Sequence, residues 1–301
     1  MGLEDIKSIV DISEEISNRA NGVLNWFQHP KEEARKFLVE KISKSENLTA
    51  EEAATLIYNS RKLTREYANS KTIYEKAKEH FDEKEQSSYI DDDWLHFFFD
   101  KAEKVSNKSM QLIWAKMLSG EFNKPGSISR KLMHIISIMD ANSAKSFETF
   151  SYYVVERAGL ITSYDTETVI IPEGFYSNSF DFMRKVETWL RENGYNDYRN
   201  LAIELTMNTG ELNSLENLGL IQRVQDAKCA IPLIYQMDDS AVYINPQDDS
   251  EIPLGQYSLT TEGKQLFEIV NKRGNENVLK IIEQYLMSAN VKFTMEKILR
   301  R

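Results

Sequence analysis

Residues Asp91 to Ser129 read DDDWLHFFFDKAEKVSNKSMQLIWAKMLSGEFNKPGSIS, and this stretch decides the fold. Its apolar residues recur at three- and four-residue intervals, which is typical of short amphipathic helices around one core. Carboxylates suit the start of the first helix because they face its unpaired N–H groups. Caps are also expected at Ser106 and at Ser127 or Ser129. The segment 120–127 predicts a turn.

The next residues extend this core downstream. One helix is expected to carry Leu132, Ile135 and Ile136, and another to span about 141–158. Residues 91–158 are thus expected to form three or four short helices around one core.

Residues 159–301 have the element order of a winged helix. Val169–Ile171 predicts a strand or hairpin, a helix stops at Gly219 and runs into a strand, and Thr260 or Thr261 caps a later helix. Helices are also expected at about 178–193, 197–208 and 276–288, and strands near 230–236, 241–244, 257–259 and 291–295. The expected wing precedes residue 257.

Asp248, Asp249 and Glu251 make this expected wing acidic. A wing that reads DNA lies along phosphates and needs cations. The acidic wing therefore favours a protein-contacting or structural module and disfavours nucleic acid as a partner.

Long helices are expected upstream, in residues 1–90. Pro30 predicts a helix to about residue 44, and Thr49 with Glu52 forms a T-x-x-E capping box. No Gly or Pro follows up to about residue 86, which predicts a long helix or hairpin of a kind that often self-associates. Residues 3–27 predict a helix that packs on the protein or on a second copy; membrane contact is the alternative.

The predicted fold class is mainly α (α+β), with a helical N-terminal and central region and a C-terminal winged-helix-like module with short antiparallel strands. The expected domains are 1–90, 91–158 and 159–301. The net charge of −10 is spread evenly, and no block is basic. Residues 1–15 have no continuous apolar run, and no 18 uncharged apolar residues occur together, so a cytoplasmic location is expected.

Few residues suggest chemistry. Asp93, His96 and Asp100 share a helix face and could hold a metal, but capping by Asp93 and solvation of Asp100 are the favoured explanation. The single cysteine, Cys229, is expected to be buried. The four histidines, His29, His80, His96 and His134, have no metal-site spacing, and the common nucleotide-binding and hydrolase loops are missing. No catalytic, cofactor-binding or metal-binding residue is assigned, and no cofactor is expected.

The block from Asp93-Trp94 through Trp114-Ala115-Lys116-Met117-Leu118-Ser119-Gly120-Glu121 to Pro125-Gly126-Ser127-Ile128-Ser129 resembles a bacterial family known as domain of unknown function 2806. The later Leu259-Thr260-Thr261-Glu262-Gly263 is similar to the same family. The W-A-K-x-L and L-T-x-x-G patterns also look like those of abortive-infection-type proteins, which implies a role in phage defence.

Three functions are considered. The first is a non-enzymatic interaction or regulatory protein of phage defence or stress response, with itself or another protein as partner. The second is a winged-helix transcriptional regulator, which needs a basic surface over residues 211–218. The third is an enzyme whose site joins separated residues such as Asp93, His96 or His134.

Overall fold

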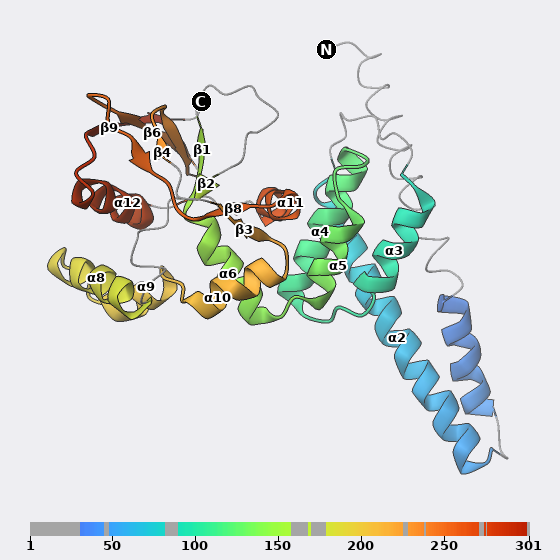
Figure 1. Cartoon of the computed structure of the whole chain (residues 1–301). Helices are drawn as coiled ribbons and strands as arrows, with labels where there is room; N and C mark the ends of the chain where they lie inside the picture. Colours follow the sequence, from blue (N-terminus) through green and yellow to red (C-terminus); the bar gives the residue numbers. More distant parts are fainter. Residues whose placement is uncertain are drawn as a thin grey trace, which may run out of the picture. The chain divides into compact units, whose positions relative to one another are not determined.

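The computed structural model describes residues 31–44, 48–81, 90–157, 168–169, 179–224, 228–237, 239–270, 274 and 276–299. The chain divides into two compact units, Met1–Ser137 and Ile138–Arg301. Helices dominate, and the described strands are antiparallel and lie in the second unit (Figure 1). The expected mainly helical class with C-terminal antiparallel strands is confirmed.

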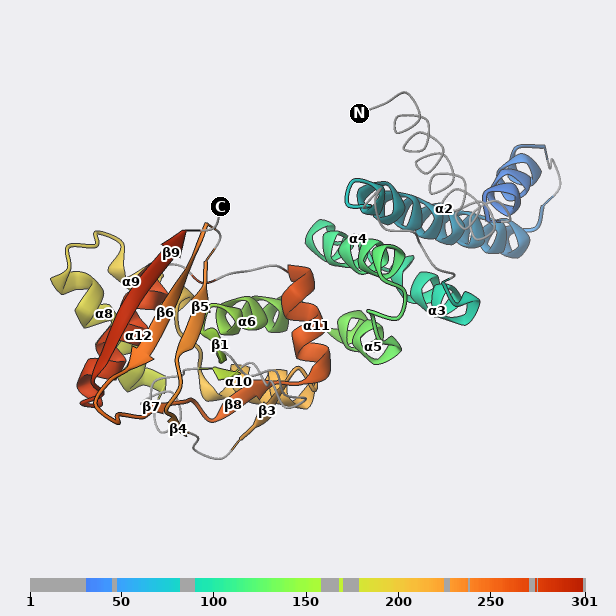
Figure 2. The same ribbon diagram turned by 90° about the horizontal axis from the view of Figure 1, so that it is seen from above.

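The first unit consists of helices. The helix at 31–44 runs beside the N-terminal half of α2 (Ala50–Lys78), and α3 (Asp92–Ala102), α4 (Lys108–Asn123) and α5 (Arg130–Ile138) follow (Figures 1 and 2). The predicted capping box is confirmed: Glu52 N–H donates to Thr49 Oγ1 at 3.2 Å, and Thr49 N–H donates to Glu52 Oε2 at 3.0 Å. Helix α2 ends at Lys78, short of the end predicted near residue 86. Residues 82–86 and the helix predicted at 3–27 lie outside the described residues.

The caps of the central helices are mostly as predicted. Asp91 caps α3 by accepting from Trp94 N–H at 2.8 Å, and Ser129 accepts from Leu132 N–H at 3.0 Å in the first turn of α5. The prediction for Ser106 is wrong. Asn107 caps α4, since its side-chain oxygen reaches two backbone N–H groups, whereas Ser106 Oγ accepts from Asn69.

The core of this unit is aromatic. Phe98 and Trp114 are fully buried, with ring centroids 5.2 Å apart in an edge-on contact, and Trp94 stacks on Phe98 at 5.2 Å. Met117 and Leu118 are also completely buried. The apolar residues that recur at three- and four-residue intervals in this part of the sequence therefore lie on the core-facing side of α4.

The turn after α4 begins later than predicted. Gly120 belongs to α4, which continues to Asn123, and the turn comprises residues 124–129. Gly126 carries the left-handed backbone of this turn, with φ of +82°, a conformation in which side chains other than glycine are strained.

The second unit begins with a helix shorter than predicted. Here α6 (Ala141–Ser151) is shorter than the helix predicted at 141–158, and Val154–Arg157 forms β1. The β-branched Val154 and Val155 pair with β2 (Thr168–Val169), which outweighs the local helical pattern. Residues 170–171 of the predicted strand lie outside the described residues.

One antiparallel sheet organises this unit, with the strand order β3-β8-β2-β1-β5-β6-β9. Figure 2 shows β5, β6 and β9 side by side. The further strands are β3 (Ile221–Arg223), β5 (Leu233–Gln236), β6 (Ser240–Pro246), β8 (Tyr257–Leu259) and β9 (Phe293–Leu299), and β4 (Lys228–Cys229) pairs separately with β7 (Ile252–Pro253). The helices are α8 (Ser179–Glu192), α9 (Tyr198–Glu204), α10 (Thr209–Asn217), α11 (Thr261–Val270) and α12 (Glu276–Ser288). These helices lie near their predicted positions, except that α9 ends at Glu204 and not near residue 208.

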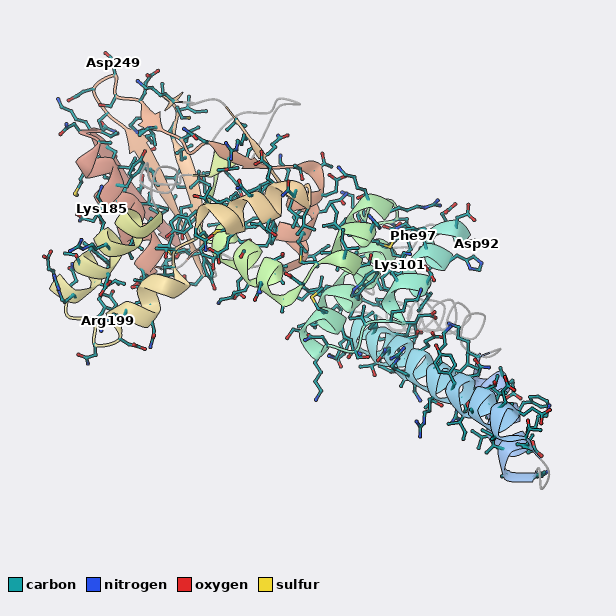
Figure 3. All side chains as sticks on the ribbon, turned by 60° about the horizontal axis from the view of Figure 1, so that its bottom comes forward. Asp92, Phe97, Lys101, Lys185, Arg199 and Asp249 are labelled. Carbon is teal, nitrogen blue, oxygen red and sulfur yellow. The ribbon has the colours of Figure 1, made fainter. Side chains whose placement is uncertain are left out.

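The acidic loop is not a wing between two paired strands. It follows β6, which pairs with β5 and β9, whereas β8 pairs with β2 and β3. Asp248 and Asp249 have φ of +50° and +55°, and Figure 3 shows Asp249 at the outer end of the loop. This wing prediction is wrong because the partners of β6 are distant in sequence, and local order does not reveal them.

Candidate interaction surface

The helix at 31–44 and the first half of α2 form a two-helix hairpin with many exposed residues. The helix at 31–44 covers one stripe of α2, which holds five half-buried residues: Ala53, Leu56, Ser60, Leu63 and Tyr67. No residue of α2 before Glu66 is fully buried. From Glu66 onward α2 joins the core with α3 and α4. The first half of α2 therefore packs on one side only.

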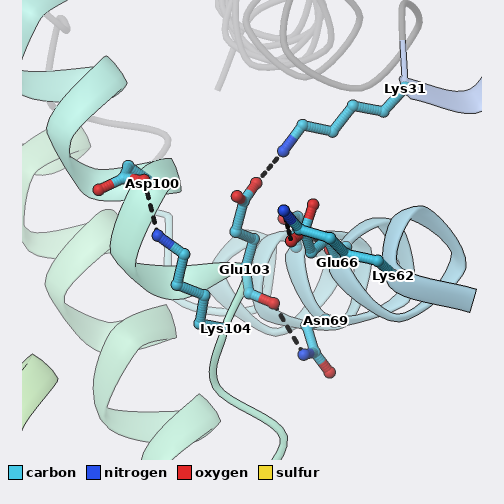
Figure 4. A network of polar contacts seen from close by, with 8 residues as sticks. Lys31, Lys62, Glu66, Asn69, Asp100, Glu103 and Lys104 are labelled. Carbon is cyan, nitrogen blue, oxygen red and sulfur yellow. Dashed lines mark hydrogen bonds and ion pairs between the residues drawn. The ribbon is translucent and has the colours of Figure 1, made fainter. Parts of the chain in front are cut away.

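Charged side chains fix the base of this hairpin. Lys31 forms an ion pair with the nearly buried Glu103, which follows α3, and Lys62 lies 4.0 Å from the buried Glu66 (Figure 4). Burial lowers the pKa of Lys31, and the carboxylates of Glu66 and Asp100 oppose that shift. The Lys31–Glu103 pair attaches the start of the helix at 31–44 to the end of α3, whereas the Lys62–Glu66 pair lies within α2.

The next turn of the hairpin is held by Tyr67. Its hydroxyl donates to Glu32 Oε2 at 3.4 Å, and the Arg35 guanidinium lies 6.0 Å from the centre of its ring. Both contacts set the register between the two helices, because they join the first two turns of one helix to one residue of the other.

Asn69 connects α2 to the α3–α4 junction. Its amide group donates to the carbonyl oxygen of Glu103 at 2.8 Å (Figure 4). The amide group also donates to Ser106 Oγ at 3.1 Å, and its oxygen accepts from Gln111 Nε2 at 3.2 Å. Gln111 also donates to the Val105 carbonyl at 2.9 Å. A buried polar network that is satisfied in this way fixes one arrangement of the helices.

Large apolar side chains point outward from the hairpin. Tyr58 on α2 is 67% exposed, and Phe37 on the partner helix is 62% exposed. Val39 and Ile57 are also exposed, and Lys41 Nζ lies 6.0 Å from the Phe37 ring centre. Exposed apolar groups gathered on one protruding element indicate an interaction surface more than a folding core.

The block that resembles a family motif is a structural joint. Glu121 is buried at the end of α4 and accepts from the N–H groups of Gly126 at 2.6 Å and Ile128 at 3.0 Å. Burial raises the pKa of Glu121, and these hydrogen bonds partly oppose the rise. Trp94 Nε1–H donates to the Ile128 carbonyl at 2.8 Å. The G-E and P-G-S-x-S elements of the pattern are therefore explained by packing.

The L-T-x-x-G motif has an equally definite structural role. Thr260 Oγ1 donates to the Gly219 carbonyl at 2.6 Å and accepts from Gly263 N–H at 3.0 Å, so it joins the end of α10 to the start of α11. A Cβ atom on Gly263 would lie 1.9 Å from the Leu220 carbonyl oxygen. Only glycine fits this close approach.

The residues considered for metal binding or catalysis do not form a buried site. Asp93, His96 and His134 are all exposed. Asp93 lies 3.9 Å from Arg130, and Asp100 pairs with Lys104 at 2.8 Å. Within the described residues, no group of three or more His, Cys, Asp or Glu side chains has the geometry of a metal site.

The remaining candidates are placed as follows. Cys229 is buried, as predicted, and its thiol donates to the Ile231 carbonyl at 3.4 Å. His80 is exposed, and His29 lies outside the described residues. No described helix combines the length and the apolar composition needed to cross a membrane.

Sequence reasoning missed the outward face of α2 and the roles of Glu121 and Asn69. A signal for the first was present, since Glu51, Tyr58 and Arg65 recur at seven-residue intervals and must share a helix face. Glu121 gave a weaker signal, as a carboxylate on the buried side of α4.

Comparison with known proteins gives one family match, and its range includes both motifs described above, at Glu121 and at Thr260–Gly263. No curated protein and no solved structure matches the chain. One family model does match, described as protein of unknown function (DUF2806), and it covers residues 58–283. Its range includes both the Glu121 joint and the Thr260–Gly263 motif. The chain belongs to the DUF2806 family.

Proposed function

We propose that this protein is a non-enzymatic interaction protein that self-associates through its N-terminal hairpin. The observation that carries the proposal is the one-sided packing of α2: among the described helices, the one at 31–44 covers its first half, and Tyr58 is exposed. A hairpin of two helices alone buries little surface, and further apolar contact stabilises it. A second protein surface supplies that contact.

The second unit supports a scaffold role, with a winged-helix-like arrangement. Elements α6, β1, β2, α8, α9, α10 and β3 come in this order along the chain, β8 comes later, and β8 lies between β2 and β3 in the sheet. In this assignment the wing is the connection from β3 to β8, which contains β4 to β7. The shape is thus proposed from the sheet order, with a different wing from the acidic loop.

A protein partner suits this module better than DNA. The helix that would enter a DNA groove, α10, carries Glu211 and Glu216 and no Lys or Arg. Its exposed side chains include Asn213 and Asn217. Without cations, such a helix gains nothing from phosphate contacts. A transcriptional regulator remains the second candidate, and titration of a labelled random duplex at low salt tests it; tight binding would favour it.

A role in phage defence or stress response is proposed from the W-A-K-x-L and L-T-x-x-G patterns. Both patterns have structural roles in this protein. The proposal therefore concerns the process in which the protein takes part and assigns no functional site. Plaque formation in bacteria with and without the intact gene tests it. Equal plaque numbers for a broad phage panel and equal survival under stress would contradict it.

Light scattering on the purified full chain tests self-association. We expect a mass of two or more chains at micromolar concentration, and a lower mass for Tyr58→Lys. Met287→Lys is the matched control, because Met287 on α12 is 53% exposed and lies outside the hairpin. A mass of one chain for the unsubstituted protein would contradict the proposal.

A further inference from the structure

Three exposed residues on the outward face of α2 are evenly spaced, with opposite charges on either side of a central tyrosine. Glu51, Tyr58 and Arg65 are seven residues apart, about 10.5 Å or two helical turns at 1.5 Å per residue, so they lie in one row. This row is opposite the stripe that the helix at 31–44 covers, and all three side chains are exposed. Tyr58 is the midpoint, with a carboxylate on one side and a guanidinium at the same distance on the other.

An antiparallel copy of the same helix complements this row. If Tyr58 of two copies meet at a two-fold axis, Glu51 of each copy lies opposite Arg65 of the other, because both are seven residues from the axis. Ala54 and Thr55 then face Lys62 and Arg61 across the contact. The small side chains allow the two helices to approach closely, and the aliphatic stems of Lys62 and Arg61 cover them.

The charges on this face are free to make such contacts. Glu51, Arg61 and Arg65 form no ion pair with other residues in the part of the chain that the structure describes. Lys62 is partly compensated by Glu66 at 4.0 Å. A carboxylate and a guanidinium left without partners at matched positions favour a second copy over an unrelated surface.

We propose that two copies of this chain associate through α2 in an isologous antiparallel contact centred on Tyr58, with two Glu51–Arg65 ion pairs between the copies. The inference rests on the proposed self-association and specifies its partner, its symmetry and its register. Each copy contributes the same residues, so the contact closes at a dimer and does not extend into a filament.

A charge exchange tests this register. Glu51→Arg and Arg65→Glu each place like charges opposite each other in their own homodimer, and we expect each to raise the dissociation constant by about tenfold or more, as two ion pairs become two repulsions. A one-to-one mixture of the two variants restores both pairs. We expect the mixture to dimerise as the unsubstituted chain does in sedimentation velocity.

The mixture separates an interface effect from a folding effect. Glu51 lies in the first turn of α2, so its reversal also weakens that helix end, but a folding defect would persist in the mixture. Lys185→Glu, on the exposed side of α8, is the control and is expected to leave the dissociation constant unchanged (Figure 3).

The outcomes distinguish the two proposals. If the unsubstituted chain is a dimer and neither reversal weakens it, or if the mixture fails to recover, this register is wrong while self-association stands. If the unsubstituted chain is monomeric at about 100 μM, both proposals fail. If the monomer instead binds an acidic polymer such as heparin through Arg61 and Arg65, the occupant is an anion and the inference is overturned.

Discussion

Glu121 shows how one buried side chain specifies a turn. Its carboxylate accepts from Gly126 and Ile128, and its loss leaves the buried N–H group of Ile128 without an acceptor, at about 1–3 kcal/mol. The left-handed Gly126 and the carboxylate thus act together on residues 124–129. The same joint positions the Ile128 carbonyl that accepts from Trp94.

The raised pKa of Glu121 gives a pH-dependent prediction. The folded protein holds a proton on Glu121 more tightly than the unfolded chain does, so this residue's contribution falls as pH rises from the ordinary value of 4.5 through the raised one. In Glu121→Gln this pH-dependent contribution to the free energy of unfolding is absent. Urea unfolding of both proteins across that range measures the difference in unfolding free energy, which we expect to shrink toward higher pH. A constant difference would contradict the assignment.

Substitution by alanine is expected to have opposite effects on stability at two glycines, Gly263 and Gly120. In Gly263→Ala the new Cβ would lie 1.9 Å from the Leu220 carbonyl, so we expect a loss of about 3 kcal/mol in unfolding free energy, because backbone atoms must move. In Gly120→Ala the nearest atom is 3.7 Å away, and alanine favours the helix by roughly 0.5–1 kcal/mol. Thermal unfolding measures both. Equal shifts in the unfolding temperature of the two variants would show that Gly263 does not approach the Leu220 carbonyl closely.

At the scale of the element, the capping box sets where α2 begins. Thr49→Ala removes the acceptor for Glu52 N–H and is expected to cost about 1 kcal/mol. The loss should appear as faster amide hydrogen exchange in residues 50–60, because the first half of α2 has little other support. Thr64→Ala, an exposed position within the same helix, is the control and should not increase exchange. Equal rates of amide hydrogen exchange in residues 50–60 of the two variants would contradict a local role for the cap.

Helix starts were predictable because their signals are local. Thr49 and Asp91 were identified from the sequence, and so was the end of α10 at Gly219, where the backbone has φ of +76°. The choice of Asn107 over Ser106 as a cap depended on Asn69, which is distant in sequence and occupies the serine. Gly120 remained helical because Glu121 anchors the turn beyond it.

Strand pairing was less predictable for a similar reason. The positions of β5, β6, β8 and β9 follow from β-branched and aromatic runs, but their order in the sheet depends on contacts between distant segments. Val154 and Val155 appear helical in the pattern of α6, yet they pair with β2, and the next two residues, Glu156 and Arg157, pair with β5. The acidic loop was misassigned as a wing because its flanking strands belong to different pairs.

At the scale of the whole molecule, the two units carry different kinds of feature. The second unit holds an antiparallel sheet and the Thr260–Gly263 joint, and the first holds an aromatic core with a hairpin that remains open on one side. Neither unit brings the considered catalytic residues into a buried cluster among the described residues. The exposed face of α2 is the feature that internal packing does not explain.

Cross-linking at position 58 tests the central claim of a symmetric α2 contact most directly. In Tyr58→Cys, a short bismaleimide should join two chains rapidly, since the two-fold axis places this position opposite itself, while the native Cys229 is buried. Asn59→Cys is the matched control, because one residue along a helix turns the side chain by about 100°. We expect a covalent dimer for position 58 and little for position 59. Equal yields at both positions, or no dimer at either, would contradict it.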